Sequence, residues 1–332
     1  MADFTIPSAD ELLEFDLINA FCWVARTNNI SRAAAQLNTS QPVITRKIGK
    51  LEKDLGVELF VRSNRGCELT PAGELLVSKV PGILLQIAQL RGEVCASVNA
   101  VTGLMVMGIT HSAGAVMAPH ILPAFAQRWP KLRVSLAEAV SRALSTRLLN
   151  RELSFAVLHD PPAHSDLVTT TLLLEKVHLV GPPALMAAPG LATPSVQDLV
   201  DLPLVMPSGQ HTLRNLLDDA FAEIDRIVNP VYEATSVSML RSMAAQGLGY
   251  ALLTLGSVAD DVAAGRLIAR PLQDKGMSVA LSLVTTQEQS RLRNVQLVSE
   301  LVASEIRRVA RAGLWPGNPT VVDPAPRHTA RT

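Results

Sequence analysis

The sequence is poor in cysteine, in aromatic residues and in charge. Its 332 residues include three cysteines, 4% aromatic residues and 18% charged residues. Cys22, Cys67 and Cys95 are scattered and odd in number, and no C-x-x-C pair occurs, which argues against a disulfide framework or a zinc site. We expect three small buried hydrophobes in a reducing compartment, with redox sensing as the alternative.

The chain also lacks net charge and a secretory signal. Thirty basic residues balance thirty acidic ones, which excludes a globally basic coat for nucleic acid but allows a local basic patch. Residues 1–15 have no basic and no apolar signal segment. Residues 104–127 contain no charged side chain, yet their glycines and prolines favour a buried strand and helix over a membrane span. We therefore expect a cytoplasmic protein that has no membrane partner.

What the sequence does have is length, apolar residues and an uneven distribution of charge. Its 332 residues suit two or three domains, and 48% hydrophobic residues can fill a sizeable core. Residues 1–15 form an acidic leader with four acids and no base, whereas residues 16–72 hold eight bases and five acids. This contrast indicates a small positive unit attached to a neutral body.

Residues 31–55 have the pattern of a helix-turn-helix. Residues 31–37 predict a short helix capped by Ser31, and residues 38–40 predict a tight turn. The next helix begins at Gln41, and its buried stripe consists of Ile44, Ile48, Leu51 and Leu55. We also expect a supporting helix over 17–27 and a β-hairpin wing with strands over 57–61 and 68–70.

The opposite face of the second helix suits the major groove of DNA. It carries Gln41, Thr45, Arg46 and Lys50. Gln can bond adenine, Arg can bond guanine, Thr can touch a thymine methyl group, and Lys can meet a phosphate. On charge alone, a solvated helix face is the alternative.

The residue pattern of this unit closely resembles the N-terminal domain of LysR-type transcriptional regulators. The shared positions are Ser31, Ala33, Ala34, Leu37, Ser40, Gln41, Pro42, Thr45, Arg46, Ile48, Leu51, Glu52, Leu55, Gly56, Leu59, Phe60, Arg62 and Thr70-Pro71-Ala72-Gly73. Asn29-Ile30 and Gly49 depart from the family pattern. The resemblance implies an α-helical winged helix-turn-helix over 16–72. We assign its DNA contacts to Ser31, Ser40, Gln41, Pro42, Thr45, Arg46, Lys50, Arg62 and Arg65.

Residues 73–100 predict a linker helix that dimerises the protein. Apolar residues recur with a mean spacing of 3.5 at Leu76, Val80, Ile83, Ile87, Leu90 and Val94. That repeat is typical of a coiled-coil seam, and a core-packed amphipathic helix is the alternative. Pro81-Gly82 predicts a kink or break. The resembled family dimerises through this helix, so we expect a homodimer or a homotetramer.

Residues 101–312 predict an α/β domain built from two subdomains. Strands are expected at 104–109, 134–137, 155–158, 178–181, 204–206, 250–253 and 279–284. Helices are expected at 119–128, 143–151, 213–224, 237–246 and 289–312. Subdomain I would combine 101–168 with 277–310, and subdomain II would span 169–276.

This domain resembles the LysR-type effector domain, which is similar to type II periplasmic binding proteins. The likeness is carried by Pro119, Leu122, Pro123, Phe125, Trp129, Pro130, Glu138, Leu148, Glu152-Leu153, Phe155-Ala156-Val157, Leu202-Pro203-Leu204 and residues 246–251. Leu174, residues 178–181, Ser278 and residues 281–283 resemble the nitrogen-assimilation-control branch of the family. The resemblance implies a small-molecule effector in a cleft between the subdomains.

Polar residues at the ends of the expected strands mark that cleft. They are Thr110, His111, Ser112, Ser141, Asp160, Ser208, Gln210, Thr235 and Ser236. Hydroxyl groups and free backbone N–H groups at helix N-termini can hold a carboxylate, so an anionic effector is a candidate. Ordinary helix capping is the alternative for each residue, and Asp160 with the following prolines is also a candidate hinge or turn.

No motif supports an enzyme, a bound metal or a cofactor. A nucleophile elbow, a zinc-protease motif, a P-loop and a complete dinucleotide fingerprint are missing, and the histidines lack metal spacing. Residues 313–332 are rich in proline and predict a disordered tail. We expect a regulator that binds an interrupted palindrome in double-stranded DNA, with RNA polymerase as a candidate partner. The alternative is a cytosolic solute-binding or carrier module whose N-terminal helices contact proteins.

Overall fold

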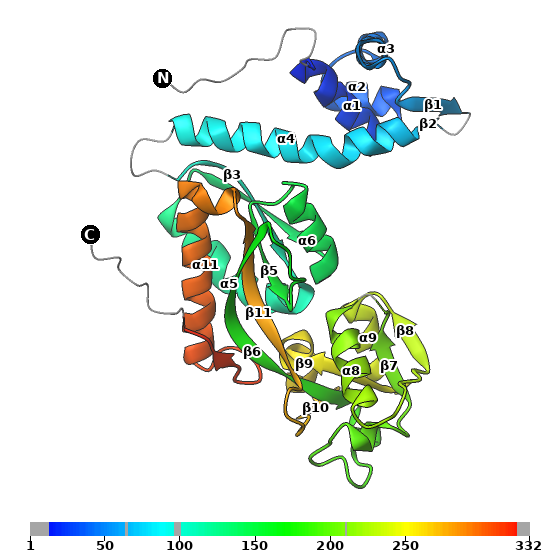
Figure 1. Ribbon diagram of the computed structural model, residues 1–332, viewed down its shortest axis with the longest axis vertical. Helices are drawn as coiled ribbons and strands as arrows, with labels where there is room; N and C mark the ends of the chain where they lie inside the picture. The colour runs from blue at the N-terminus through cyan, green and yellow to red at the C-terminus, as the bar shows by residue number, and fades with distance from the viewer. Residues whose placement is uncertain (1–12, 64–65, 96–100, 210, 324–332) are drawn as a thin grey trace. The chain divides into compact units, whose positions relative to one another are not determined.

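The computed structural model describes residues 13–63, 66–95, 101–209 and 211–323 (Figure 1). Met1–Gln86 and Ile87–Thr332 are its two units. Four predicted features lie outside the described residues: most of the acidic leader, Arg65, Gln210 and residues 324–332.

The N-terminal unit consists of three packed helices, a two-stranded wing and the first part of a long helix that continues past Gln86. These elements are α1 (Phe15–Thr27), α2 (Ile30–Gln36), α3 (Gln41–Leu55), β1 (Phe60–Ser63), β2 (Gly66–Leu69) and α4 (Pro71–Cys95). Ala33 and Ala34 are buried and small, which lets α2 lie close to its neighbours. Phe21 of α1 meets Phe60 of β1 with ring centroids 5.3 Å apart. The expected helix-turn-helix with a wing is confirmed.

Two local predictions in this unit are wrong. Asn29, rather than Ser31, caps α2, because its side-chain oxygen accepts a hydrogen bond from the Arg32 backbone N–H over 3.0 Å. Strand β1 begins at Phe60 rather than at residue 57. Glu52 explains the later start, since its Oε1 accepts hydrogen bonds from the N–H groups of Leu59 and Phe60 over 2.8 and 3.2 Å.

Helix α4 runs without a break through Pro81, so of the predicted kink or break the break is wrong and the kink stays a prediction. A proline removes one backbone hydrogen bond, and the 25-residue helix continues past that loss.

The C-terminal unit is built on one mixed sheet with the strand order β4-β3-β5-β11-β6-β9-β7-β8. The strands are β3 (Gly103–Ile109), β4 (Leu132–Glu138), β5 (Phe155–His159), β6 (Leu167–Gly181), β7 (Leu204–Pro207), β8 (Tyr232–Ala234), β9 (Tyr250–Thr254), β10 (Ile268–Pro271), β11 (Ser278–Thr286) and β12 (Thr320–Val321). The helices are α5 (His111–Arg128), α6 (Ser141–Leu149), α7 (Pro183–Met186), α8 (Thr212–Ala222), α9 (Val237–Ala245), α10 (Ala259–Ala263) and α11 (Arg293–Arg311).

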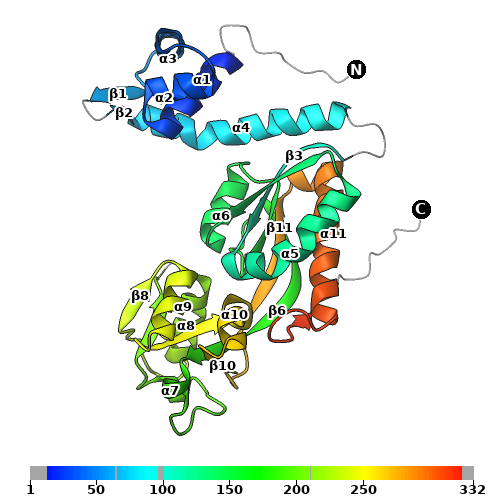
Figure 2. The same ribbon diagram turned by 180° about the vertical axis from the view of Figure 1, so that it is seen from behind.

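Strands β6 and β11 join the two halves of this unit. They pair antiparallel from Ser278↔Lys176 to Thr286↔Leu167, and β6 continues onward to pair with β9 and β10. Both views show these two long strands passing from one half to the other (Figures 1 and 2). The chain therefore crosses twice between the halves, as the sequence predicts.

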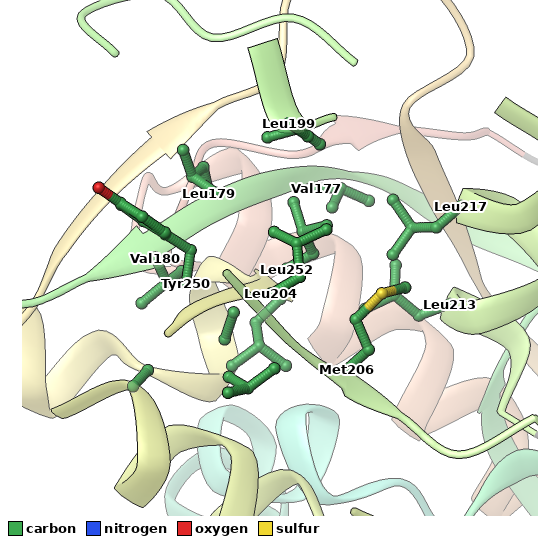
Figure 3. Close-up of a cluster of buried hydrophobic side chains, with 14 of the residues drawn as sticks. Val177, Leu179, Val180, Leu199, Leu204, Met206, Leu213, Leu217, Tyr250 and Leu252 are labelled. Carbon is green, nitrogen blue, oxygen red and sulfur yellow. The ribbon is translucent and has the colours of Figure 1, made fainter. Parts of the chain in front are cut away.

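Each half has its own apolar core. In the half that contains β7 and β9, residues Val177 and Leu179 of β6 pack with Leu252 and with Leu217 of α8 (Figure 3). The other half packs α5 and α11 against the sheet around Met117, Phe155, Val302 and Ile306. Two cores joined by shared strands leave a cleft where the halves face each other.

Several predicted boundaries in this unit need correction. Helix α5 begins at His111, not at residue 119, and holds Pro119 and Pro123 inside it. Strand β6 begins at Leu167 instead of 178. The predicted disordered tail is wrong for residues 313–323, because Trp315 is 1% exposed and β12 pairs with β6. The sequence reading also missed β8, β10, β12, α7 and α10.

The described cysteines resemble buried apolar residues more than reactive groups. Cys22 and Cys67 are free thiols, and Cys67 is buried in the core of the N-terminal unit. Burial raises the pKa of Cys22 to about 11, which keeps it protonated at neutral pH. The side chain of Cys95 lies outside the described residues.

Candidate DNA-binding face and effector cavity

Helix α3 has one apolar face and one polar face. Ile44, Ile48 and Leu51 are buried, while Gln41 and Arg46 are exposed. The other predicted contacts on this surface are half-buried (Thr45) or exposed (Ser31, Ser40, Pro42 and Lys50). The predicted residues of α2 and α3 are therefore accessible, and the Ser31 hydroxyl lies 3.0 Å from Gln41 Oε1. Arg62 lies on β1, but its side chain and all of Arg65 are outside the described residues.

Two acidic residues at the start of the unit contact the basic residues of α3. Glu14 forms an ion pair with Lys50, and Asp16 forms one with Lys47 over 2.8 Å. The sequence reading did not include Lys47 or these pairs, because the partners lie about thirty residues apart in the chain.

The apolar repeat on α4 divides into a part that packs within the protomer and a part that is exposed. Leu76 packs against the core of the N-terminal unit, and Val80 is buried. Ile83, Ile87 and Leu90 are 48%, 46% and 61% exposed. The side chain of Val94 lies outside the described residues. The exposed half of the repeat is the part that can meet another copy.

The cleft of the C-terminal unit holds a cavity of about 240 Å³. Six predicted residues line it: Thr110, His111, Ser112, Ser141, Thr235 and Ser236. Asp160 and Ser208 do not line this cavity. Asp160 is in a turn with φ of 39°, and its Oδ1 accepts a hydrogen bond from the Ala280 N–H over 2.8 Å. The backbone of Ser208 closes the turn before α8, because its carbonyl accepts a hydrogen bond from the His211 N–H over 3.0 Å.

Four helices begin at the cavity wall, and three of them lack a side-chain cap. Helices α5, α6 and α9 follow Thr110, Val140 and Ser236, none of which caps its helix with a side-chain hydrogen bond. Helix α8 differs, because His211 Nδ1 accepts a hydrogen bond from the Leu213 N–H over 3.2 Å. Uncapped first turns offer backbone N–H groups to a ligand.

The cavity wall has little formal charge. Among the described residues that line it, none is Lys or Arg, and the one carboxylate, Glu138, lies 2.9 Å from His111 Nδ1. Burial, together with the nearby His159, lowers the pKa of His211 to about 4. His211 is therefore neutral at physiological pH, which is consistent with its role as a hydrogen-bond acceptor.

The sequence reading missed His159, which lines the cavity, together with Glu175 and Trp315. His159 Nδ1 is 2.9 Å from Thr110 Oγ1, and His159 Nε2 is 2.7 Å from Glu175 Oε2. Trp315 Nε1 donates a hydrogen bond to Glu175 Oε1 over 2.9 Å. Spacing in the sequence carries no signal for this chain of contacts, because Glu175 and Trp315 are 140 positions apart.

A helix-turn-helix unit joined to a two-lobed α/β unit with a ligand-sized cleft defines a class of protein: an effector-responsive transcriptional regulator. The model of the bacterial regulatory helix-turn-helix protein, lysR family, matches residues 15–74, and the LysR substrate binding domain matches residues 99–307. The chain belongs to the LysR family of transcriptional regulators.

Relatives and solved structures agree with this assignment. The HTH-type transcriptional regulator BbuR of Bordetella bronchiseptica (strain ATCC BAA-588 / NCTC 13252 / RB50) is 59% identical over 320 residues, covering 96% of this chain and 98% of BbuR. The nitrogen assimilation regulatory protein nac of Escherichia coli (strain K12) is 25% identical over 296 residues, covering 89% and 95%. The finer assignment to a nitrogen-assimilation-control branch stays a prediction.

The fold is that of full-length regulators of this family. The crystal structure of CbnR, a LysR family transcriptional regulator, covers 89% of this chain and 99% of its own, with a TM-score of 0.70 and 20% identity. Full-length CbnR complexed with its target DNA has a TM-score of 0.68 over 89% and 100% of the two chains, also at 20% identity.

The protein is thus a DNA-binding transcriptional regulator with an effector-binding domain, and its relatives are regulators rather than enzymes. This result favours the regulator over the carrier module that the sequence left open. Within the described residues, no helix combines the length and apolar character needed to cross a membrane.

Proposed function

We propose that α3 reads the operator from the major groove. Gln41, Thr45 and Arg46 would face base edges, and Lys50 would face the phosphates. The observation that supports this role is the two-sided helix, with Ile44 buried on one side and Gln41 and Arg46 exposed on the other. Ser31, Ser40, Pro42, Arg62 and Arg65 complete the contact surface.

The exposed part of the α4 repeat would join two copies of the chain. Two recognition helices would then enter successive major grooves of an interrupted palindrome. The functional boundaries that follow are 16–72 for DNA binding, 73–100 for dimerisation and 101–312 for effector binding. A regulator of this kind works in the cytoplasm, where RNA polymerase is a candidate partner.

The cavity in the C-terminal unit would hold a small carboxylate. Three uncapped helix N-termini supply N–H donors, and Ser112, Ser141 and Thr235 supply hydroxyl groups. These N–H and hydroxyl donors stand without a Lys or Arg beside them in the cavity wall. They therefore suit a ligand with one negative charge better than one with several, because each helix N-terminus contributes only about half an elementary charge. The single feature that carries this proposal is the convergence of these helix starts.

A ligand in this cavity would contact both halves of the C-terminal unit. Thr110 and Ser141 come from one half, and Thr235 and Ser236 come from the other. A ligand that fits one arrangement of the halves better would favour that arrangement. The arrangement would then be coupled to the spacing of the DNA-binding units or to the bend of the DNA.

The DNA-binding proposal is tested by titrating the protein with its own upstream intergenic DNA and with random DNA. A dimer that makes about 6–10 phosphate contacts should lose roughly 10³–10⁵ in affinity between 50 and 200 mM salt. Gln41→Ala and Arg46→Ala should each weaken the preference for the operator by about 1–3 kcal/mol. Unchanged operator selection in both variants would contradict the assignment of α3.

The effector proposal is tested with a panel of small carboxylates and the matching neutral amides. Thermal stability of the full chain should rise with one or more carboxylates and not with their amides. Ser141→Ala removes only the hydroxyl group, whereas Ser141→Pro also removes the first N–H of α6 at a position where proline fits a helix. The proline variant should lose clearly more affinity than the alanine variant. Equal losses would rule out the Ser141 N–H as a ligand.

A further inference from the structure

The chain folds a C-terminal segment, residues 312–323, onto the strand that joins the two halves. The family match ends at residue 307, before this segment begins. Strand β12 pairs with β6 at Thr320↔Leu174, and the Val322 N–H donates to the Leu172 carbonyl over 2.8 Å. Trp315 is 1% exposed. The segment is therefore an integral part of the fold in this protein.

The indole of Trp315 is the first link of a buried chain of hydrogen bonds that ends at the cavity. Its Nε1–H donates to Glu175 Oε1 over 2.9 Å, and Glu175 is 4% exposed. The other oxygen, Oε2, is 2.7 Å from His159 Nε2. A carboxylate accepts, so His159 carries its proton on Nε2 and presents Nδ1 to Thr110 Oγ1, 2.9 Å away.

These hydrogen bonds engage the side chain of Thr110, which stands where a residue normally caps a helix, just before α5. Thr110 is the residue before α5, and its extended backbone, with φ of −74° and ψ of 153°, is the conformation of an N-cap residue. A threonine there normally accepts a hydrogen bond from the second or third N–H of the helix. In this structure it makes no such bond, and its hydroxyl group instead donates to His159 Nδ1 over 2.9 Å.

We propose that Trp315 is a positioning residue for the effector site, which acts through Glu175 and His159 to hold the Thr110 hydroxyl away from α5. The N–H group of Ser112, a residue that lines the cavity, then stays available to a ligand. This inference rests on the proposed effector site for its function. The positioning itself is a property of the protein without a ligand, so the two can fail separately.

Other groups near His159 do not replace this role. Asp160 is bonded to Ala280, His211 caps α8, and Glu138 contacts His111. Glu175 Oε2 bonds the Nε2 atom of the His159 ring, and Trp315 Nε1 bonds the other carboxylate oxygen, Oε1.

The test measures amide hydrogen exchange at Ser112 and Ala113 in the ligand-free full-length protein. In Trp315→Phe, Glu175 Oε1 loses its donor, so the carboxylate can rotate away from His159 Nε2. We expect His159 to follow and the Thr110 side chain to turn and cap α5. Exchange at these two amides should slow by about fivefold, the factor that corresponds to a typical N-cap contribution of ~1 kcal/mol. Simple loosening of the fold would accelerate exchange instead.

Four further variants complete the experiment. His159→Phe frees Thr110 directly and should give the largest slowing. Thr110→Val removes the capping group, so Trp315→Phe should have no slowing effect in that background. Val322→Pro removes the N–H bonded to Leu172 and loosens the segment without changing Trp315, so it should slow exchange even if Trp315→Phe fails to fold. Trp129→Phe is the matched control, since Trp129 contacts Phe125 and Arg128 outside this chain.

The outcomes separate clearly. Slowing in His159→Phe but not in Trp315→Phe or Val322→Pro would overturn the role of the C-terminal segment. The absence of slowing in all three would overturn the whole chain of contacts. Slowed exchange together with no carboxylate binding by the wild-type protein would support the positioning and contradict the proposed effector class.

Discussion

The hydroxyl group of Ser31 donates a hydrogen bond to the side-chain oxygen of Gln41 over 3.0 Å. This bond joins the first turn of α2 to the first turn of α3 on an exposed surface. It fixes the amide of Gln41, so that its NH₂ group is directed by the protein before DNA arrives. Ser31, which the sequence suggested as a helix cap, instead orients the side chain of Gln41, the residue that we propose reads bases.

Removing this bond should reduce discrimination between bases more than it reduces binding to random DNA. Gln41→Ala should cost about 1–3 kcal/mol of discrimination at its base pair, and Ser31→Ala should cost a fraction of that. Fluorescence anisotropy on the operator and on base-substituted operators measures both effects. Ser78→Ala, on α4, is a control that should change neither. A Ser31→Ala protein with wild-type discrimination would show that Gln41 needs no partner.

Neutralising Glu14 should strengthen DNA binding at low salt. Glu14→Gln removes the carboxylate that pairs with Lys50, which leaves Lys50 available to a phosphate. Because the pair is exposed, we expect about a two- to fivefold gain in operator affinity, and the gain should fade as salt rises. Binding isotherms from 50 to 200 mM salt check this, with the exposed Glu74→Gln as control. A gain of equal size in the control would assign the effect to net charge alone.

A charge in the exposed part of the α4 repeat should weaken self-association. Ile87→Asp would place a carboxylate where the proposed partner helix packs, and we expect the dimer dissociation constant to rise at least about tenfold. Leu75→Asp is a matched control, because Leu75 is also exposed on α4 but lies off the repeat. Sedimentation equilibrium measures both, and an unaltered profile for Ile87→Asp would refute the seam.

The C-terminal unit should lose stability as the pH falls below 6.5. Burial lowers the pKa of His211 to about 4 in the folded state, while an unfolded histidine keeps a value near 6.5. Between these values the unfolded state binds the proton and the folded state does not, so acid favours unfolding. From pH 7.5 to pH 5 the loss from this group is about 2 kcal/mol.

His211→Asn should flatten that dependence and leave the fold intact, because asparagine can also cap α8. Denaturation midpoints at several pH values measure the slope. Part of it should remain, because burial also lowers the pKa of His178. A slope identical to that of the wild-type protein would mean that His211 takes up its proton in the folded state.

Local pattern was sufficient for much of the fold. The buried stripe of Ile44, Ile48 and Leu51 was enough to predict α3. Asn38, which has a φ of 50°, was enough to predict the turn before it. The helix start at His111 could not be read in the same way, because Pro119 and Pro123 are strong local signals against a helix interior. Tertiary packing of Met117, Ile121 and Phe125 in the core overrode them.

The cavity was predictable where one residue sits at one strand end, as with Thr110, Ser141 and Thr235. It was not predictable where contacts join distant segments. His159 ends β5 as Thr110 follows β3, but its partners are Glu175 of β6 and Thr110 itself, and only the folded sheet brings them together. Asp160 fits the same strand-end pattern and is nevertheless a turn residue that bonds Ala280.

The hydrogen bond between Trp315 and Glu175 also has a consequence for the order of events during synthesis. Its partners are separated by 140 positions, and every other member of the chain from Thr110 to Glu175 leaves the ribosome before Trp315 does. The nascent domain can bury its sheet early, while the bond between Trp315 and Glu175 must wait for the C-terminal segment. Readiness to sense a ligand would then come after folding of the core, as a separate and later step in the maturation of each newly made chain.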